Sequence, residues 1–437
     1  MTQAVIQIGG MDKEQQQEIL PVLPRSLEQV GLSSQFLVEL LAKILFLRGQ
    51  LRLVDLAEHT KLSISILEPL LTFMRNERLC EVSRSSETET SISYNLTDLG
   101  RLRAEDFLRK SQYAGPAPVS LNAYVEQVHA QTIANMRTTR KELLRAFEGI
   151  VLKEQILKQF GAAMNSGRAI FVYGPAGSGK TFVSEKLVRL LSGNIAVPYA
   201  IAVDNEVIQV YDPLVHEQVA QDETPIGLDR RWSPDLRWVL CRRPVVKTGG
   251  ELTLSMLDLD FDESARFYQS PPQVKANNGL FLIDDLGRQL ASPLDIMNRW
   301  IVPLDRHVDY LTLHTGKKFV LPFDVIVVFS TNMPPNQLAD EAFLRRLGYK
   351  IYIGHLSEDE YRAISRQVCD QFQIPYSDKQ LDYLLREHHY KEEKPLLACI
   401  PRDILGQLRD IARYEERQPE LSEELLDWAW NNYFAHD

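Results

Sequence analysis

Two consecutive carboxylates end an apolar run in residues 279–288, GLFLIDDLGR. The four large apolar residues before them suit a strand that is buried on both faces. Asp284 and Asp285, at the carboxyl end of such a strand, are costly to bury unless a cationic group meets them. The pair therefore predicts a site for a cation, which other elements of the chain must help to build.

A glycine-rich segment, GPAGSGKT, stands between an expected strand and an expected helix and fits the pattern G-x-x-x-x-G-K-[ST]. Glycines let backbone N–H groups curl around phosphate oxygens, and the helix that follows adds its positive end. We expect Lys180 to reach the β- and γ-phosphates of a nucleotide, and the Thr181 hydroxyl to ligate Mg²⁺. The expected phosphate-binding residues are Gly174, Pro175, Ala176, Gly177, Ser178, Gly179, Lys180 and Thr181.

This loop gives the carboxylate pair a function. A phosphate-bound Mg²⁺ needs a carboxylate near Thr181, and the end of a neighbouring strand can supply it through Asp284. Asp285 would then face the γ-phosphate and orient or activate the attacking water. The alternative is that Asp285 only caps the following turn.

Composition is that of an ordinary globular protein of 437 residues, long enough for two to four domains. The formal net charge of −10 argues against general coating of nucleic acid. Four well-separated cysteines fit neither a metal site nor a disulfide framework and indicate a reducing, cytoplasmic location. We see no signal peptide and no apolar stretch of about 18 residues, so we expect no membrane insertion.

Hydrophobic patterns divide the chain into five parts. Residues 1–30 read as a flexible lead-in, and residues 31–112 have three helices followed by a hairpin, the order of a winged helix-turn-helix domain. A linker and a helical segment follow in 113–148. Strands alternate with helices in 149–355, which predicts a parallel α/β sheet, and 356–437 is a small all-α domain. In that last part, the adjacent histidines of REHHYKE are interpreted as a solvated helix end.

From about residue 150 to residue 437 the chain resembles the AAA+ ATPases, because the family's motifs occur in the family's order. The resemblance implies an α/β P-loop NTPase core with an α-helical lid, binding of ATP and Mg²⁺, and assembly into a ring, with six subunits in many members. The matching segments are GPAGSGKT (Walker A), FLIDD (Walker B), VIVVFSTN (sensor 1), EAFLRRLGYKI (arginine finger), IPRDI (sensor 2) and YLTLHTGKKFVLP, similar to the pre-sensor hairpin of MoxR-like members.

The resemblance assigns roles to four more residues. Asn332 would hold the lytic water, although by itself it could be a turn residue. Arg346 or Arg345 would reach the γ-phosphate of a neighbouring subunit, although isolated arginines more often lie on the surface. Arg402, a cation in the first turn of a helix, suggests an anionic partner such as ATP.

One position departs from the common family pattern, since most members carry glutamate where this chain has Asp285. Aspartate is one methylene shorter, and a displacement of about 1 Å can cost roughly 10²-fold in rate. Bacterial replication initiators and helicase loaders of the same superfamily also carry two aspartates at this position. We therefore expect slow ATP hydrolysis and not an inactive site.

The charge balance of the N-terminal part bears on the target of such a motor. Residues 33–110 contain eleven basic and eleven acidic residues, and the segment expected as the wing contains Glu87 and Glu89. DNA-binding proteins usually place several Lys or Arg side chains against the phosphates of the DNA backbone. This balance favours docking of a protein over binding of DNA. Phe267 and Tyr268 could be core residues or grip a substrate, and the hairpin expected in VVKTGGELTLS could face the pore or the ligand.

The sequence therefore predicts a cytoplasmic, Mg²⁺-dependent, ring-forming ATPase that remodels a protein target recruited by its N-terminal domain. The alternative is an ATP-switched DNA-binding protein of initiator or loader type, in which turnover matters little.

Overall fold

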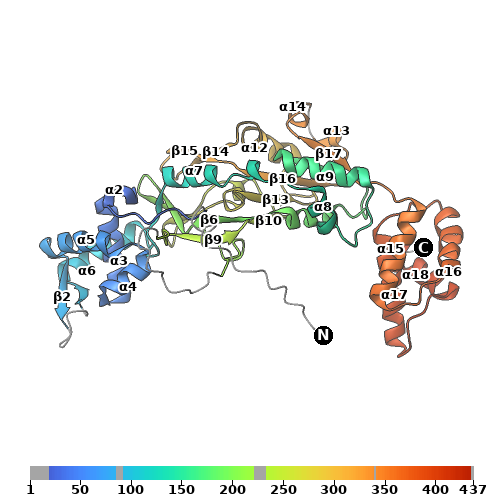
Figure 1. The fold of residues 1–437 in the computed structure, drawn as a ribbon, viewed down its shortest axis with the longest axis horizontal. Helices are drawn as coiled ribbons and strands as arrows, with labels where there is room; N and C mark the ends of the chain where they lie inside the picture. The colour runs from blue at the N-terminus through green and yellow to red at the C-terminus, as the bar shows by residue number, and fades with distance from the viewer. Residues whose placement is uncertain (1–18, 85–91, 221–232, 339–340, 435–437) are drawn as a thin grey trace.

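The structure is a computed structural model that describes residues 19–84, 92–220, 233–338 and 341–434. The molecule is elongated, with N-terminal helices at one end and a bundle of C-terminal helices at the other (Figure 1). Sheets and helices of the central residues lie between these ends (Figure 1). Within the described ranges, no helix is both long enough and apolar enough to cross a membrane.

Residues 27–110 form what we call the N-terminal unit, in which helices pack around an antiparallel sheet of strand order β1-β3-β2. The helices and the hairpin expected from the sequence are present in the expected order, although residues 85–91, with Glu87 and Glu89, lie outside the described residues. The elements are α2 (Leu27–Val30), α3 (Ser34–Arg48), β1 (Leu51–Arg52), α4 (Leu53–Thr60), α5 (Ile64–Asn76), β2 (Cys80–Arg84), β3 (Ile92–Leu96) and α6 (Asp98–Lys110).

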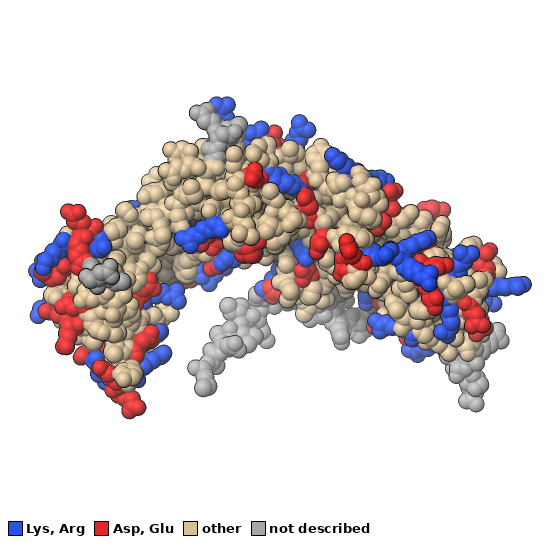
Figure 2. All heavy atoms as spheres, turned by 180° about the vertical axis from the view of Figure 1, so that it is seen from behind, with Lys and Arg blue, Asp and Glu red and all other residues tan. Residues whose placement is uncertain are grey.

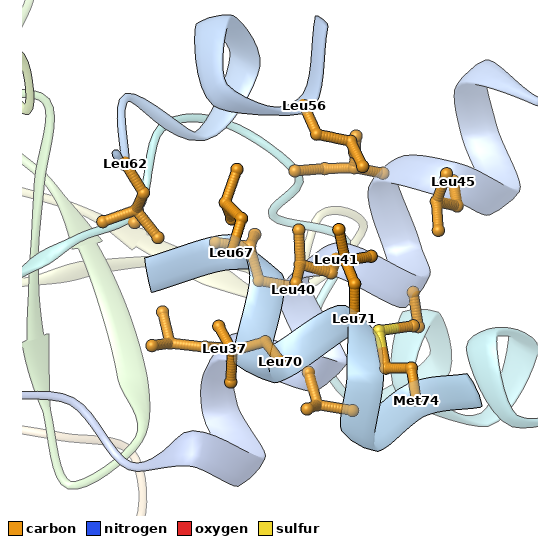
Figure 3. Packing of buried hydrophobic residues seen from close by; sticks show 14 of the residues in the cluster. Leu37, Leu40, Leu41, Leu45, Leu56, Leu62, Leu67, Leu70, Leu71 and Met74 are labelled. Carbon is orange, nitrogen blue, oxygen red and sulfur yellow. The ribbon is translucent and has the colours of Figure 1, made fainter. Parts of the chain in front are cut away.

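Leucines at helical spacing form the core of this unit. Leu37 and Leu41 of α3 meet Leu67 and Leu71 of α5, and each of the four is at most 1% exposed (Figure 3). Burying one such side chain contributes about 1.5–3 kcal/mol. Ser33 starts α3 by accepting a hydrogen bond from the Phe36 N–H, which satisfies one of the free donors at the helix end.

Two segments expected to be flexible are packed in the structure. In the lead-in, Leu20 and Val30 are buried, and residues 1–18 lie outside the described part. In the expected linker, Tyr113 and Val119 are buried, and β4 (Val119–Ser120) pairs with β7 (Ala200–Val203). Prolines and glycines suggested a linker, but apolar side chains among them found partners on a sheet that lies far along the sequence.

A second set of strands, which we call the β unit, lies between the N-terminal unit and the parallel sheet described next (Figure 1). It has a five-stranded sheet of order β11-β12-β8-β7-β4, the antiparallel pair β6–β9 and the hairpin β14–β15, and the hairpin confirms the one expected at YLTLHTGKKFVLP. The remaining elements are β6 (Asn194–Pro198), β8 (Glu206–Gln209), β9 (Trp238–Arg242), β11 (Asp260–Asp262), β12 (Phe267–Gln269), β14 (Val308–Thr312), β15 (Lys318–Pro322) and α7 (Leu121–Ala130).

Phe267 and Tyr268 belong to β12 of this unit. Tyr268 is only 1% exposed, and the Phe267 ring meets that of Tyr113 edge-on at 5.5 Å between centroids. The core interpretation of this aromatic pair is therefore the one that the structure supports.

The central sheet has five parallel strands in the order β10-β13-β16-β5-β17. All five residues of β13 and all seven of β16 are buried, as expected for a sheet covered on both faces. Together with the glycine-rich loop between β5 and α10, this is a P-loop NTPase core. Its strands are β5 (Ile170–Tyr173), β10 (Val245–Thr248), β13 (Gly279–Ile283), β16 (Val325–Thr331) and β17 (Tyr349–Tyr352).

The helices around this sheet are α8 (Arg140–Ala146), α9 (Glu154–Ser166), α10 (Lys180–Lys186), α11 (Pro272–Lys275), α12 (Pro293–Arg306), α13 (Pro335–Leu338) and α14 (Glu341–Leu344). The prediction of a hairpin in VVKTGGELTLS is wrong. Its first residues form β10, which pairs in parallel with β13, and the chain then turns into a short 3₁₀ helix, Ser255–Leu257. The two glycines end a strand instead of joining two strands.

The C-terminal residues form an α-helical bundle, which we call the lid. It contains α15 (Glu358–Phe372), α16 (Asp378–Tyr383), a π-helical stretch (Leu384–Tyr390), α17 (Cys399–Tyr414) and α18 (Glu423–Phe434). The interpretation of REHHYKE as a solvated helix end is wrong, because His388 and His389 are 8% and 1% exposed. They lie in the π-helical stretch and pack against Trp430.

Candidate functional site

The glycine-rich loop connects β5 to α10 and needs its glycines for steric reasons. A Cβ atom on Gly174 would lie 1.9 Å from the Ile353 carbonyl oxygen, and one on Gly177 would lie 2.5 Å from Cys399 Sγ. Gly177 and Gly179 have φ angles of 79° and 92°, in the left-handed region that favours glycine. The loop therefore has a shape that side chains would prevent.

Lys180 follows the loop and is 5% exposed. Its Nζ donates hydrogen bonds to the Pro175 carbonyl oxygen at 2.8 Å and to Asn332 Oδ1 at 2.7 Å. Burial lowers the pKa of Lys180, and the charges of Asp285 and Asp284 partly oppose that shift. The start of α10 and the end of β16 thus bring together a cation and an amide that are 152 positions apart in the sequence.

Thr181 and Asp284 meet in the same region. The Thr181 hydroxyl donates to Asp284 Oδ1 at 2.9 Å, and the same carboxylate oxygen accepts the Asp285 N–H at 3.1 Å. Asp284 comes directly after β13, whose parallel neighbour β16 ends just before Asn332. Carboxyl ends of parallel strands share one edge of a sheet, which is why these side chains converge.

Asp285 lies at the same edge and lines a cavity of about 1210 Å³. Arg288 lies near it, with 3.9 Å between Arg288 Nη1 and Asp285 Oδ2. Asp285 has a φ of 48°, which is uncommon for a residue other than glycine.

The cavity is formed by the loop, the central sheet and the lid. Lid residues that line it include Arg402 and Asp403, and Ile364 and Val368 add apolar surface. The Cys399 N–H donates to the Gly177 carbonyl oxygen at 3.0 Å, so the start of α17 touches the loop directly. Arg402 is exposed and lies in the first turn of α17, which begins at Cys399.

Arg345 and Arg346 lie apart from the residues that line the cavity. Among the described residues that line the cavity, neither arginine is present. Arg346 lies next to the end of α12, with 3.8 Å between its Nε and Asp305 Oδ1. The structure therefore brings together Lys180, Thr181, the two aspartates and Asn332, adds Arg402 across the cavity, and separates the two arginines from this group.

The residues present fit a nucleoside triphosphate with Mg²⁺. Three glycines shape a loop open to the cavity, and Ser178 Oγ is buried without a hydrogen-bond partner among the described residues, so a donor remains for a phosphate oxygen. The cation of Lys180 matches phosphate charge, while the hydroxyl of Thr181 and the carboxylate of Asp284 are hard oxygen ligands of the kind that Mg²⁺ prefers.

Sequence reasoning missed Gln289, whose side chain is hydrogen-bonded to the turn that contains Asp285. A glutamine four residues after the second carboxylate has no distinctive pattern. Only the path of the folded loop identifies it.

One family model matches the C-terminal part of the chain. Residues 357–432, most of the lid, match a family model described as a domain of unknown function, DUF8689. No curated protein matches the chain.

Solved structures match at low similarity. NtrX from Brucella abortus matches with 13% identity and a TM-score of 0.40, over 65% of this chain and 57% of the NtrX chain. The same protein in complex with ATP matches with 14% identity and a TM-score of 0.40, over 67% and 60%. The RuvB Holliday junction branch migration motor from Thermotoga maritima matches with 10% identity and a TM-score of 0.37, over 64% and 70%. At these values the matches assign neither a family nor an activity.

Proposed function

We propose that the protein is a Mg²⁺-dependent ATPase of the AAA+ type. The observation that carries the proposal is the cluster of Lys180, Thr181, Asp284 and Asn332, in which a P-loop lysine and hydroxyl contact polar groups from two neighbouring strand ends. Phosphoryl transfer needs positioning and charge stabilisation more than covalent chemistry, and this cluster supplies both.

Each residue has a role that follows from its group. The loop 174–179 would hold phosphate oxygens through its N–H groups, and Lys180 would balance their charge. Thr181 and Asp284 would hold Mg²⁺, which neutralises charge developing on the phosphates. Asp285 would orient the attacking water and accept its proton, and Asn332 would keep that water in line with the γ-phosphate.

The two arginines support a shared site. On the basis of the resemblance to AAA+ proteins, we propose that Arg345 or Arg346 completes the site of a neighbouring subunit in a ring, and neither is among the described residues that line the cavity of its own chain. A guanidinium that reaches the γ-phosphate in this way contributes rate factors of about 10³–10⁵ in phosphoryl transfer. Arg402 on the lid would contact the nucleotide from the other side of the cavity. The resemblance to AAA+ proteins suggests six subunits.

The N-terminal unit, which we propose is a winged-helix domain, would recruit a protein target. On the face seen in Figure 2, the described residues of this unit show Lys or Arg side by side with Asp or Glu and no uniform basic field. Exposed apolar side chains are present as well, including Phe73 on α5 and Leu102 on α6, at 51% and 60% exposure. Such a surface suits protein contacts better than a phosphate backbone.

Steady-state ATP hydrolysis, measured against protein concentration for wild type and Asp285→Asn, tests the proposal. We expect the wild-type rate per subunit to rise with concentration, because the site is shared, and to fall roughly 10²-fold or more in Asp285→Asn with Mg-ATP binding retained. A negligible wild-type rate despite tight binding of Mg-ATP would contradict the motor and favour a nucleotide switch.

Titration of duplex DNA with the full chain at two salt concentrations tests the N-terminal unit. Protein docking predicts weak DNA binding that ATP does not change. Tight binding with a steep dependence on salt would favour the DNA-binding alternative instead.

A further inference from the structure

The backbone at Asp285 is held in an unfavourable conformation. Its φ of 48° lies in the left-handed region, where Cβ crowds the following carbonyl group. Such residues persist when their surroundings fix them, and they concentrate at functional sites. Something must therefore hold the turn that follows β13.

The Gln289 side chain does so from inside the turn. Its Nε2 lies 3.1 Å from the Asp284 carbonyl oxygen, 3.3 Å from that of Asp285 and 3.1 Å from that of Gly249. Its Oε1 accepts the Gly287 N–H at 2.8 Å. Gln289 is 9% exposed, so these hydrogen bonds are shielded from water. One side chain thus contacts the carbonyl groups on both sides of the Asp285 backbone N–H.

We infer that Gln289 is a positioning residue that fixes the Asp285 carboxylate toward the attacking water. Gln289 touches neither phosphate nor water in this role and acts through the Asp284–Asp285 backbone. The inference rests on the proposed ATPase function.

The same geometry explains why the second carboxylate is an aspartate. Asp and Asn enter the left-handed region more readily than most residues, because their short polar side chains interact with the local backbone. Glutamate lacks that advantage. A loop with a left-handed residue at this position therefore favours Asp285, and Gln289 holds the shorter side chain in a fixed direction.

A purely structural role is the competing explanation, because Gln289 also ties the loop after β10 through Gly249. Gln289→Met removes the amide at similar length, and Gln289→Glu keeps an acceptor for the Gly287 N–H but removes the donors. Gln418→Met, in an exposed part of the lid, is the matched control.

The experiment measures kcat, KM and the Kd for Mg-ATP of these full-length variants, alone and combined with Asp285→Asn. If the Asp285 carboxylate shifts by about 1 Å, kcat should fall roughly 10- to 100-fold in Gln289→Met, with the Kd for Mg-ATP within about twofold of wild type. Combined with Asp285→Asn, Gln289→Met should lower kcat no further, since the group that it positions is gone. Gln289→Glu should behave like Gln289→Met, and Gln418→Met like wild type.

The outcomes separate the two ideas. A wild type that hydrolyses ATP while Gln289→Met keeps its kcat overturns the role of Gln289 alone, and so does an equal loss in the Asp285→Asn background. A wild type without hydrolysis overturns the proposed function and this role with it. Thermal melting without nucleotide gives an independent readout: Asp285→Gly should relax the left-handed residue, so Gln289→Met should lower Tm less in that background than in wild type.

Discussion

Two polar clusters, one at the P-loop and one in the lid, differ in how their groups are used. At the P-loop, Lys180, Asn332 and Asp285 border a cavity of about 1210 Å³, and Asp285 has a left-handed backbone. In the lid, His389 and Trp430 are enclosed by aromatic rings and hydrogen-bonded to other side chains. The first cluster retains strain and open space for a ligand, whereas the second satisfies its polar groups internally and stabilises a fold.

The lid cluster is centred on Trp430, which is fully buried. Its ring contacts those of His388, His389 and Phe434, and its Nε1 donates to Glu392 at 3.0 Å. Trp430→Ala should destabilise the lid by about 3–5 kcal/mol, because it leaves a large cavity and removes the hydrogen bond from the indole to Glu392. Urea unfolding followed by circular dichroism checks this. Trp428→Ala, at a position that is 42% exposed, is the control and should cost much less.

The P-loop cluster should respond in the opposite way. Lys180→Ala should weaken Mg-ATP binding or turnover by roughly 10²–10³-fold, the range for losing one preorganised donor to a reacting group. Unfolding free energy should change little, because a buried cation that is costly to desolvate is removed. Nucleotide titration and thermal melting measure the two effects, with the exposed Lys141→Ala as control. A large loss of stability would show that this cluster also holds the fold.

A pH titration sharpens the contrast in the lid. Burial lowers the pKa of His389 from its ordinary 6.5 to about 4. Its Nδ1 donates to the Lys394 carbonyl oxygen at 3.2 Å, so in the neutral ring its Nε2 accepts the Tyr361 hydroxyl at 2.8 Å.

The sign follows from proton linkage. Below pH 6.5 the unfolded lid binds a proton that the folded lid excludes, so stability falls as pH decreases from 6.5 toward 4. Between pH 7 and pH 5 the loss should be about 2 kcal/mol. Urea unfolding at several pH values checks this in wild type and His389→Phe. The contribution is absent if the two proteins show the same pH dependence.

Local patterns predicted much of the core and of the candidate site. The apolar runs of β13 and β16 were expected to be buried strands, and Asp284 and Asn332 directly follow them. The P-loop was equally clear, because its glycines and its lysine are fixed by spacing within eight residues. These features depend on neighbours in sequence and on the shared edge of a parallel sheet.

Long-range packing decided what sequence reasoning misjudged. Val119 was predicted to be part of a linker, but in the structure it pairs with β7. His388 was predicted to be solvated, but in the structure its ring packs against Trp430. Gly249 and Gly250 suggested a hairpin, but parallel pairing of β10 with β13 left no return strand. In each case the deciding partner lies too far along the chain to influence a local pattern.

By itself, the sequence determined which groups could bind a nucleotide, because a P-loop and the ends of buried strands specify lysine, hydroxyl and carboxylate by local spacing. Only the tertiary structure decided how those groups are held. The left-handed turn at Asp285 and the Gln289 amide that supports it exist because a side chain folds back onto carbonyl groups of two loops. Local preferences are set by adjacent residues, whereas the direction of a carboxylate is set by whatever the completed fold places beside it.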